Sequence, residues 1–533
     1  MSDAEAYTRI PYPGLAFPQT HPDRLALLAT LHGLEPAPPD LARVLEVGCA
    51  DGLNLVAMAG HAPGLRAVGF DLVDPALGRE AAAALRLGNV RLEQGDLLEE
   101  RDWGEFDYVV AHGVYAWVPD AVREALMALF ARCLAPHGVA FVSYNALPGA
   151  RLRTMLREMV LLHAGGTPNL GERVHRGREL YGFLAPWAQD RPDAYGAVLA
   201  SELERLRRLP IPVLAHDDLG GRYDPVWLRD VALHADRHGL RYLGDAEPGE
   251  LRADRQPPGV DAQLDALADG NRVVWEQYAD LLAGRAFRQT LLCRSDAPLD
   301  DAIEPGRLAR LWFSATEQAA AGEAPRDDQT EAGEAPCDDQ TEAGKAPRED
   351  GQTDLPLGGG GAAGAAPRRS GSTGPPAVAQ LALARPRALS FGELRAALGD
   401  ADPAALAGEL WRAFRAGEVD LFAAPARHVM VAGAQPEASP VARWQATRGP
   451  ELTSLRHDPV RLDDPFGRFL VRLCDGTRDR AALVDALVAA IGSELPLAIE
   501  GTPVTDGEAV RARVADGLEH NLEILARLGM LRA

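Results

Sequence analysis

The sequence predicts an α/β core built on a parallel sheet, followed by a helical insertion, a linker and α+β modules. Short apolar runs alternate with amphipathic helical patterns between residues 43 and 144, which is typical of βαβ units. Residues 151–209 carry long amphipathic runs and no strand pattern. Beyond residue 377, two similar halves each predict two helices, a glycine turn and a strand, which is the order of a winged-helix-like module.

Seven apolar runs are expected to form the sheet. Five of them lie in the first 150 residues, at 44–47, 66–72, 90–94, 106–112 and 138–145. A helix over 225–240, with a glycine near its end, separates them from two later runs at 241–247 and 287–294. We expect the two later runs to return to the same sheet as its last strands.

A repetitive segment interrupts the second half of the chain. An eleven-residue unit occurs three times from residue 321, as AGEAPRDDQTE, AGEAPCDDQTE and AGKAPREDGQT, and a Gly/Ala tract follows it. Each unit contains Pro and Gly and almost no large apolar residue, so it cannot bury enough surface to offset its ordering entropy. We therefore predict a disordered linker, which contains Lys345, the only lysine of the chain.

These patterns divide the chain into consecutive parts with different roles. The expected parts are a ligand-binding α/β domain (1–150), a helical insertion acting as lid or dimer contact (151–212), a region completing the sheet (213–298), the start of a middle domain (299–318), the linker (319–376) and two winged-helix-like modules (377–435 and 436–533).

The composition narrows the class of partners. The 533 residues include 55 basic and 77 acidic side chains, a formal charge of -22, which argues against binding a phosphate backbone. The winged-helix-like modules show no basic helix face, so we expect protein contacts and no nucleic acid. Five scattered cysteines, no secretory signal pattern and no membrane-spanning apolar run predict a soluble, cytoplasmic protein without a membrane partner.

The segment VLEVGCADGLNL, residues 44–55, ends a predicted strand in a glycine turn before a helix. A phosphate-binding P-loop needs Lys followed by Ser or Thr after its last glycine, where this chain has Leu53 and Asn54. A dinucleotide fingerprint starting at Gly48 needs further glycines at positions that hold Ala50 and Leu53. Both phosphate ligands are therefore disfavoured.

S-adenosylmethionine fits this turn better, because it has no pyrophosphate. Amide groups at the helix start can receive its carboxylate, and Glu46 at the strand end can face its ammonium group. Asp71 closes the second strand and is placed to accept both ribose hydroxyls. Asp96, after Gly95 at the end of the third strand, can accept from the adenine amine. Three acids at successive strand ends lie on one edge of a parallel sheet.

Further segments resemble a known family. PYPGLAFPQTHPDRLALLATLHGL (11–34), AHGVYAWVPDAVREAL (111–126) and VSYNALPGARLR (142–153) resemble class I S-adenosylmethionine-dependent methyltransferases with a methyltransferase regulatory domain. This group includes rickettsial protein-lysine methyltransferases of outer-membrane protein B. The likeness covers about 7–294 and resumes near 439 with SPVARWQATRG and LTSLRHDPVRLDD. It implies a Rossmann-like, seven-stranded methyltransferase sheet and S-adenosylmethionine as the cofactor.

The resemblance also implies which residues surround the cofactor. Ala50 stands where glycine is commoner, which is tolerated if its φ is negative. The implied contacts are Glu46, Gly48, Cys49, Ala50, Gly52 and Asn54 at the methionine end, Asp71 and Leu72 at the ribose, Asp96 and Leu97 at the adenine, Ala111 and His112 beside the sulfonium, and Gln19, Thr20 and His21 in a segment over the cofactor mouth.

The methyl acceptor is expected beyond the fourth and fifth strands. An amine nucleophile must lose a proton, which an apolar pocket promotes, and aromatic walls suit both a lysine stem and a sulfonium. Candidates for substrate contact are Tyr115, Trp117, Tyr144 and Asn145, with His216 and Asp217 ordering a loop or touching substrate; His112, Tyr115 and Tyr144 are the candidate catalytic residues.

No metal site is expected from the sequence. His234 and His238 are one helical turn apart, but no glutamate stands beside His234 and no third ligand is indicated, which favours a surface or packing role. The leading function is methylation of protein lysine side chains by a possible homodimer. The alternatives are a small-molecule or natural-product methyltransferase and a non-catalytic, cofactor-binding interaction protein.

Overall fold

The computed structural model describes most of the chain. The described residues are 14–533 except 168, 253–256, 258, 301, 317, 318, 320–374, 386, 492–494, 496, 497, 500, 501, 504–506 and 533. The predicted linker, with Lys345, therefore lies almost entirely outside the described residues. Within them, no helix combines the length and the apolar composition needed to cross a membrane.

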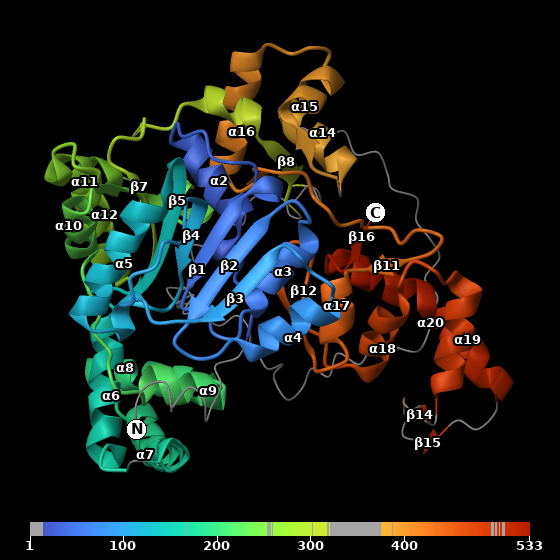
Figure 1. Ribbon diagram of the computed structural model, residues 1–533, viewed down its shortest axis with the longest axis horizontal. Coiled ribbons are helices and arrows are strands. Elements are labelled where there is room, and N and C mark those ends of the chain that lie inside the picture. The colour runs from blue at the N-terminus through green and yellow to red at the C-terminus, as the bar shows by residue number, and fades with distance from the viewer. Residues whose placement is uncertain are drawn as a thin grey trace.

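A seven-stranded sheet forms the centre of the protein (Figure 1), with the strand order β3-β2-β1-β4-β5-β7-β6. β1 to β5 pair in parallel, and β7 is antiparallel to both β5 and β6. The expected seven strands and their grouping in one sheet are confirmed. The strands are β1 Arg43–Val47, β2 Arg66–Asp71, β3 Val90–Gln94, β4 Phe106–Ala111, β5 Leu134–Asn145, β6 Leu240–Asp245 and β7 Phe287–Arg294.

One strand begins earlier than expected. β5 starts at Leu134, four residues before the predicted run, because Leu134 pairs with Phe106 of β4. Pro136 interrupts the apolar pattern there and cannot donate a ladder hydrogen bond. The register of β4 and β5 accordingly shifts between Phe106 and Tyr108.

Helices cover both faces of the sheet and enclose two hydrophobic cores. One core packs α2, α3 and α4 on the sheet, and the other packs α5 and α10 on the opposite face. Successive strand residues point to opposite faces of the sheet, so the strands contribute side chains to both cores. The covering helices are α2 Pro22–Leu31, α3 Leu53–His61, α4 Ala76–Ala84, α5 Asp120–Cys133 and α10 Leu228–Arg237, with α11 Val260–Ala268 and α12 Arg272–Ala283 preceding β7.

The helical insertion has its own core, as its amphipathic runs predict. It consists of α6 Ala150–Ala164, α7 Leu170–Gln189 and α8 Ala194–Arg208, followed by α9 Ile211–Val213 and a π-helical turn at Leu214–Asp218. It lies at the lower left of Figure 1, below the sheet.

A small module is formed by segments on both sides of the linker. Its three-stranded sheet has the order β10-β8-β9, and β8, Trp312–Ala315, precedes the linker while the other two strands follow it. The unit therefore begins before residue 377, since long-range strand pairing joins residues on both sides of the linker. Its remaining elements are α14 Pro376–Ala384, β9 Leu389–Ser390, α15 Phe391–Ala397, α16 Pro403–Arg415 and β10 Val419–Phe422.

The C-terminal domain packs directly on the sheet domain. Its helix α17, Pro440–Gln445, lies against α3, and His61 Nε2 of α3 lies 2.7 Å from Ser439 Oγ. A Cβ at Gly60 would lie 2.5 Å from Val441 Cγ2, so the backbones approach closely. The other elements are β11 Glu437–Ala438, β12 Glu451–Thr453, β13 Pro459–Arg461, α18 Pro465–Leu473, α19 Arg480–Ala490, β14 Ala498–Ile499, β15 Thr502–Pro503, α20 Gly507–Arg527 and β16 Leu531–Arg532.

Candidate cofactor and active site

A buried polar network lies under the glycine turn at the end of β1. Glu46 is 3% exposed, and its Oε1 accepts a hydrogen bond from Asn54 Nδ2 at 2.8 Å. The same amide group donates to Thr20 Oγ1 at 3.2 Å. Glu46 Oε2 is buried and has no hydrogen-bond partner among the described residues. An unpaired buried carboxylate oxygen is costly, so this atom is suited to a donor from a ligand.

The C-terminal domain contributes a residue to this network that the sequence analysis missed. His457 is 1% exposed, and its Nε2 lies 2.8 Å from Asn54 Oδ1; because an amide oxygen only accepts, the ring donates. Its ring centroid lies 4.9 Å from that of His21. His457 belongs to the segment LTSLRHDPVRLDD, which carried the family resemblance but suggested no role for a side chain.

The turn itself uses three residues with positive φ: Gly48 at 72°, Ala50 at 49° and Gly52 at 83°. A Cβ at Gly52 would lie 2.6 Å from Leu92 Cδ1, so glycine is needed there for space as well. The condition named for tolerating alanine at this position, a negative φ, is therefore not met. Its left-handed conformation is held by Asp71, whose Oδ2 accepts from the Ala50 amide at 2.8 Å.

Asp71 ends β2 and organises the neighbouring loops. Its Oδ1 accepts from the Val73 amide at 2.9 Å, and its main-chain carbonyl accepts from Gly95 at 2.8 Å. Leu72 is 50% exposed beside it, and Asp96 and Leu97 follow β3 with partly buried side chains. The predicted ribose and adenine residues therefore lie along one sheet edge, next to the turn.

The N-terminal segment 14–21 lies over this edge. The Phe17 amide donates to Asn54 Oδ1 at 3.0 Å, and Gln19 Nε2 lies 2.9 Å from His112 Nε2. Thr20 is fully buried, and a Cβ at Gly14 would collide with the Asp51 carboxylate. The three residues proposed in this segment thus contact Asn54, His112 and His457, which lie on three different parts of the chain.

Burial sets the protonation of the acids in the network. Burial, reinforced by the charges of Asp51 and Asp71, raises the pKa of Glu46 to about 7 against the hydrogen bond from Asn54. Burial also raises the pKa of Asp51 to about 6 and that of Asp71 above its ordinary value. The buried Cys49 thiol has its pKa raised and remains protonated. A cation in this site would relieve the repulsion among the carboxylates.

His112 occupies the junction between the cofactor edge and the acceptor side. Its ring packs against Phe17 at a centroid distance of 4.3 Å and against Phe141 at 5.8 Å. Burial lowers the pKa of His112 to about 4, so the ring is neutral at physiological pH. Its Nε2 then accepts from the Gln19 amide.

The two predicted tyrosines lie together, but their hydroxyl groups bond within the protein. The ring centroids of Tyr115 and Tyr144 are 6.0 Å apart. The Tyr115 hydroxyl lies 2.8 Å from His234 Nδ1, and the Tyr144 hydroxyl lies 2.8 Å from Thr290 Oγ1. Burial raises the pKa of Tyr115 to about 12, so it stays protonated. This geometry offers their rings, more than their hydroxyl groups, to an acceptor.

Asn145 ends β5 and directly follows Tyr144. It is 2% exposed, and its Oδ1 has no hydrogen-bond partner among the described residues. Trp117 contacts Tyr223 at a centroid distance of 5.2 Å, at the base of the insertion. Asn145, one of the predicted acceptor-side residues, therefore has unused hydrogen-bonding capacity among the described residues.

His216 and Asp217 lie in the π-helical turn that follows the insertion. They are 5% and 6% exposed. Arg157 donates to the Asp217 carbonyl at 3.1 Å, and Arg153 pairs with Asp218 at 3.2 Å. This buried arginine–aspartate network fixes the insertion to the chain that follows it. A substrate contact by His216 or Asp217 stays a prediction.

Family models match three parts of the chain. A model described as a methyltransferase domain matches residues 20–181, and one described as a predicted methyltransferase regulatory domain matches residues 212–294. A third, described as PKMT, C-terminal winged helix domain, matches residues 434–530. The third match contains His457, the residue that joins the cofactor network.

Curated proteins and solved structures show similarity over the same parts. Uncharacterized protein RP789 of Rickettsia prowazekii (strain Madrid E) is 32% identical over 56% of this chain and 54% of its own length, so the chain spans about half of that protein. Uncharacterized protein RP028 of the same organism is 30% identical over 40% of this chain and 87% of its own length.

Two structures of PKMT2 from Rickettsia typhi, one in complex with AdoHcy, match with TM-scores of 0.76 and identities of 22% and 23%. They cover 98% of this chain and 100% of their own chains, which shows a shared fold. Together with the residues matched by the family models and by RP028, the comparisons show that this chain belongs to the class I S-adenosylmethionine-dependent methyltransferases that carry a methyltransferase regulatory domain and a PKMT-type C-terminal winged helix domain.

Proposed function

We propose that the chain transfers the methyl group of S-adenosylmethionine to lysine side chains of proteins. The observation that carries this proposal is the end of β5, which holds Tyr144, whose ring lies 6.0 Å from that of Tyr115, and Asn145, whose buried Oδ1 has no hydrogen-bond partner among the described residues. An amide oxygen can accept from an amine, and the apolar rings favour the uncharged amine that acts as nucleophile. The fold shared with the PKMT2 structures supports this substrate class.

The cofactor fits the residues of the glycine turn. Glu46 Oε2 is a buried acceptor without a partner among the described residues, suited to the ammonium of the methionine moiety. The amides that begin α3 can hold the carboxylate. Asp71 retains acceptor capacity for the ribose hydroxyls, because each carboxylate oxygen accepts only one backbone amide. When bound, the sulfonium supplies the methyl group, and the chain aligns the amine with it and excludes water.

Because the chain has a single lysine, methyl-lysine formed on the enzyme itself can be excluded from the substrate assay. With Lys345 changed to arginine, the chain has no lysine, so every methyl-lysine found in a digest comes from an acceptor protein. We expect the Lys345→Arg enzyme to transfer labelled methyl groups to lysine Nζ atoms of proteins in a lysate of the source cells, detected by mass spectrometry. Label confined to small molecules would support the natural-product alternative. Cofactor binding without any transfer would support the non-catalytic alternative.

Cofactor affinity should rise with pH, because Glu46 must be ionised to pair with the ammonium. Its pKa of about 7 in the free protein is raised above the ordinary value, so a proton occupies it below pH 7 and is released on binding. We expect roughly 10- to 30-fold tighter binding at pH 8 than at pH 5.5, levelling off above pH 7. Calorimetry in buffers of different ionisation enthalpy measures both the affinity and the released proton.

Glu46→Gln is the matched variant for this pH dependence. It keeps the acceptor for Asn54 but cannot ionise, so its affinity should be weaker and nearly constant above pH 6. Asp51, with a pKa of about 6, accounts for any slope that remains below that pH. An unchanged slope in Glu46→Gln would contradict the assignment of the ammonium to Glu46.

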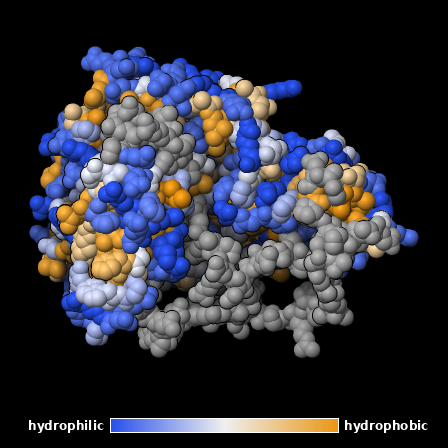
Figure 2. Space-filling model, turned by 90° about the horizontal axis from the view of Figure 1, so that it is seen from below, coloured by the Kyte–Doolittle hydropathy of each residue, from blue (hydrophilic) through white to orange (hydrophobic). Residues whose placement is uncertain are grey.

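We also propose that the helical insertion forms the homodimer contact. Apolar side chains gather over the insertion at the left of Figure 2, and its large exposed apolar residues are Leu152, Leu162, Phe183, Trp187, Tyr195 and Ile211. Exposed apolar side chains grouped on one small unit are typical of an interface. Light scattering of the purified chain tests this, and a monomer at micromolar concentration would contradict it.

A further inference from the structure

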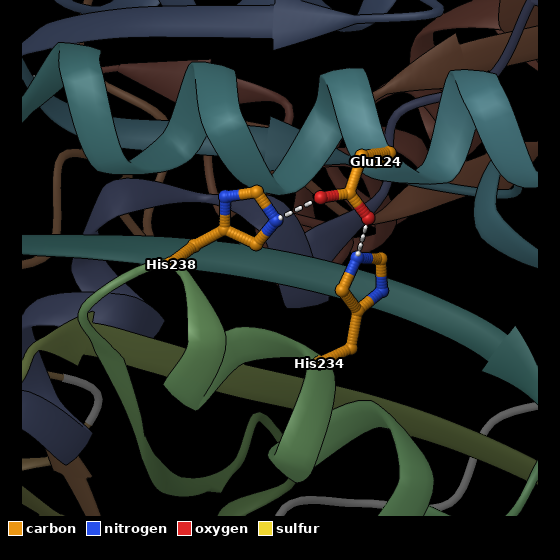
Figure 3. A group of neighbouring side chains, drawn as sticks. All are labelled: Glu124, His234 and His238. Atoms are coloured by element: carbon orange, nitrogen blue, oxygen red, sulfur yellow. Dashed lines mark hydrogen bonds and ion pairs between the residues drawn. The ribbon is translucent and has the colours of Figure 1, made fainter.

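Two helices bring three metal-ligating side chains together on the face of the sheet covered by α5 and α10 (Figure 3). Glu124 lies on α5, His234 in the last turn of α10, and His238 at its C-terminal cap. Glu124 Oε2 lies 3.0 Å from His234 Nε2, and Oε1 lies 2.9 Å from His238 Nε2. One ligand atom from each of the three residues lies within 4.8 Å of the others.

We propose that Glu124, His234 and His238 bind a divalent transition metal of the zinc class. Two imidazole nitrogens and one carboxylate oxygen form a donor set that zinc accepts at about 2.0–2.2 Å. Neighbouring ligand atoms of a tetrahedral site are then about 3.3 Å apart, close to the separations between Glu124 and the two imidazoles. Since the Glu124 side chain is 61% exposed, it can rotate to adjust, and water can reach the fourth position.

A hydrogen bond between Tyr115 and the other ring nitrogen of His234 supports this assignment. A metal on His234 Nε2 requires the proton on Nδ1, and the Tyr115 hydroxyl oxygen, 2.8 Å away, can accept it. Without metal, Nε2 carries the proton to Glu124 and the tyrosine hydroxyl donates to Nδ1. Metal binding then moves the proton of the neutral His234 ring from Nε2 to Nδ1, and His238, whose Nε2 faces Glu124 Oε1 at 2.9 Å, changes tautomer in the same way, so no net proton is released.

The position of the cluster suggests what the metal does. Glu124 lies in the part of the chain matched by the methyltransferase domain model, and both histidines lie in the part matched by the regulatory domain model. A metal bound to all three would join α5 to α10 across this boundary. It would also fix His234 and so Tyr115, whose ring faces Tyr144 on the acceptor side. We assign it a structural role, as a clamp.

Zinc titration of the chelator-treated full chain tests the proposal. We expect saturable binding of one zinc ion per chain and a thermal midpoint raised by at least about 2 °C. His238→Gln and Glu124→Gln, which lie at the accessible side of the cluster, should weaken zinc binding by at least about tenfold and remove the thermal shift. Cobalt in place of zinc should give a visible absorption band that reports tetrahedral coordination.

His175→Gln is the control. His175 and Glu179 also face each other one helical turn apart, at 3.5 Å, but belong to the exposed α7 and not to the three-residue cluster. This variant should bind zinc as the wild-type chain does. Circular dichroism without metal checks that all variants are folded. The proposal is overturned by the absence of saturable binding, or by wild-type zinc affinity in folded His238→Gln and Glu124→Gln.

Discussion

Replacing Arg288 by methionine should lower the free energy of unfolding by about 3–5 kcal/mol, because it removes the fully buried cation of a carboxylate cluster and leaves Arg285 as the remaining cation beside Asp280 and Asp245. Arg288 lies on β7 and is fully buried. Its Nε and Nη2 donate to the two oxygens of Asp280 at 2.8 Å each, and Nη2 also donates to Glu276 at 2.9 Å. Asp245 lies 3.3 Å from Nη1. Chemical denaturation of the full chain measures the loss.

The pH dependence of this loss separates charge from packing. Burial raises the pKa of Asp280, and it raises the pKa of Asp245 to about 6 although Arg288 opposes this. Without the guanidinium both values rise further, so the carboxyls become neutral as the pH falls and the penalty shrinks. The deficit of Arg288→Met should therefore be larger at pH 8 than at pH 5.5. An equal loss of unfolding free energy at both pH values would show that the loss comes from packing.

Arg294→Met provides a matched control on the same strand. Arg294 pairs with Asp296 at 3.0 Å, but the Asp296 side chain is 69% exposed. An exposed ion pair contributes about 0–1 kcal/mol, so this change should cost no more than that. Comparable losses of unfolding free energy in the two variants would show that the buried Arg288 network stabilises the fold no more than an exposed ion pair does.

The sheet was predictable because its strands are local apolar patterns. All seven runs proved to be strands, and the run at 287–294 has the bounds of β7. The start of β5 was missed for a local reason, because Pro136 interrupts the apolar pattern there. The pairing of β8 with β9 and β10 was missed for a non-local reason, because it joins residues on both sides of the linker. A pattern along the chain reports the burial of a segment but does not report which distant segment pairs with it.

The candidate site shows the same difference between local patterns, which were predictable, and long-range contacts, which were not. Glu46, Asp71 and Asp96 were predictable since strand ends of a parallel sheet share one edge. His457 was not, since it lies 403 positions from Asn54 and reaches it only because α17 packs on α3. Glu124 lies 110 positions from His234 for a similar reason, as α5 and α10 cover the same face. Tertiary packing decides both contacts.

Asp71→Asn should weaken the binding of S-adenosylmethionine by roughly 100- to 1,000-fold, because two hydrogen bonds from the ribose to a charged acceptor are lost or weakened. The variant keeps the size of the side chain and one acceptor for the Ala50 or Val73 amide. Since burial raises the pKa of Asp71, the charge is unfavourable to the free protein, and its removal offsets part of the lost amide contact. The free energy of unfolding without cofactor should therefore change by no more than about 1 kcal/mol.

Asp74→Asn is the control, three residues along the same loop. Asp74 pairs with Arg79 at 2.6 Å on the surface, so its loss should leave the affinity unchanged. Calorimetry with S-adenosylmethionine compares the variants, and wild-type affinity in Asp71→Asn would contradict the ribose assignment. The ribose hydroxyls take no part in the bond changes at the sulfonium and keep their contacts throughout the reaction, so Asp71 stabilises the ground state and the transition state alike. The loss should consequently raise the KM for the cofactor and leave kcat nearly unchanged.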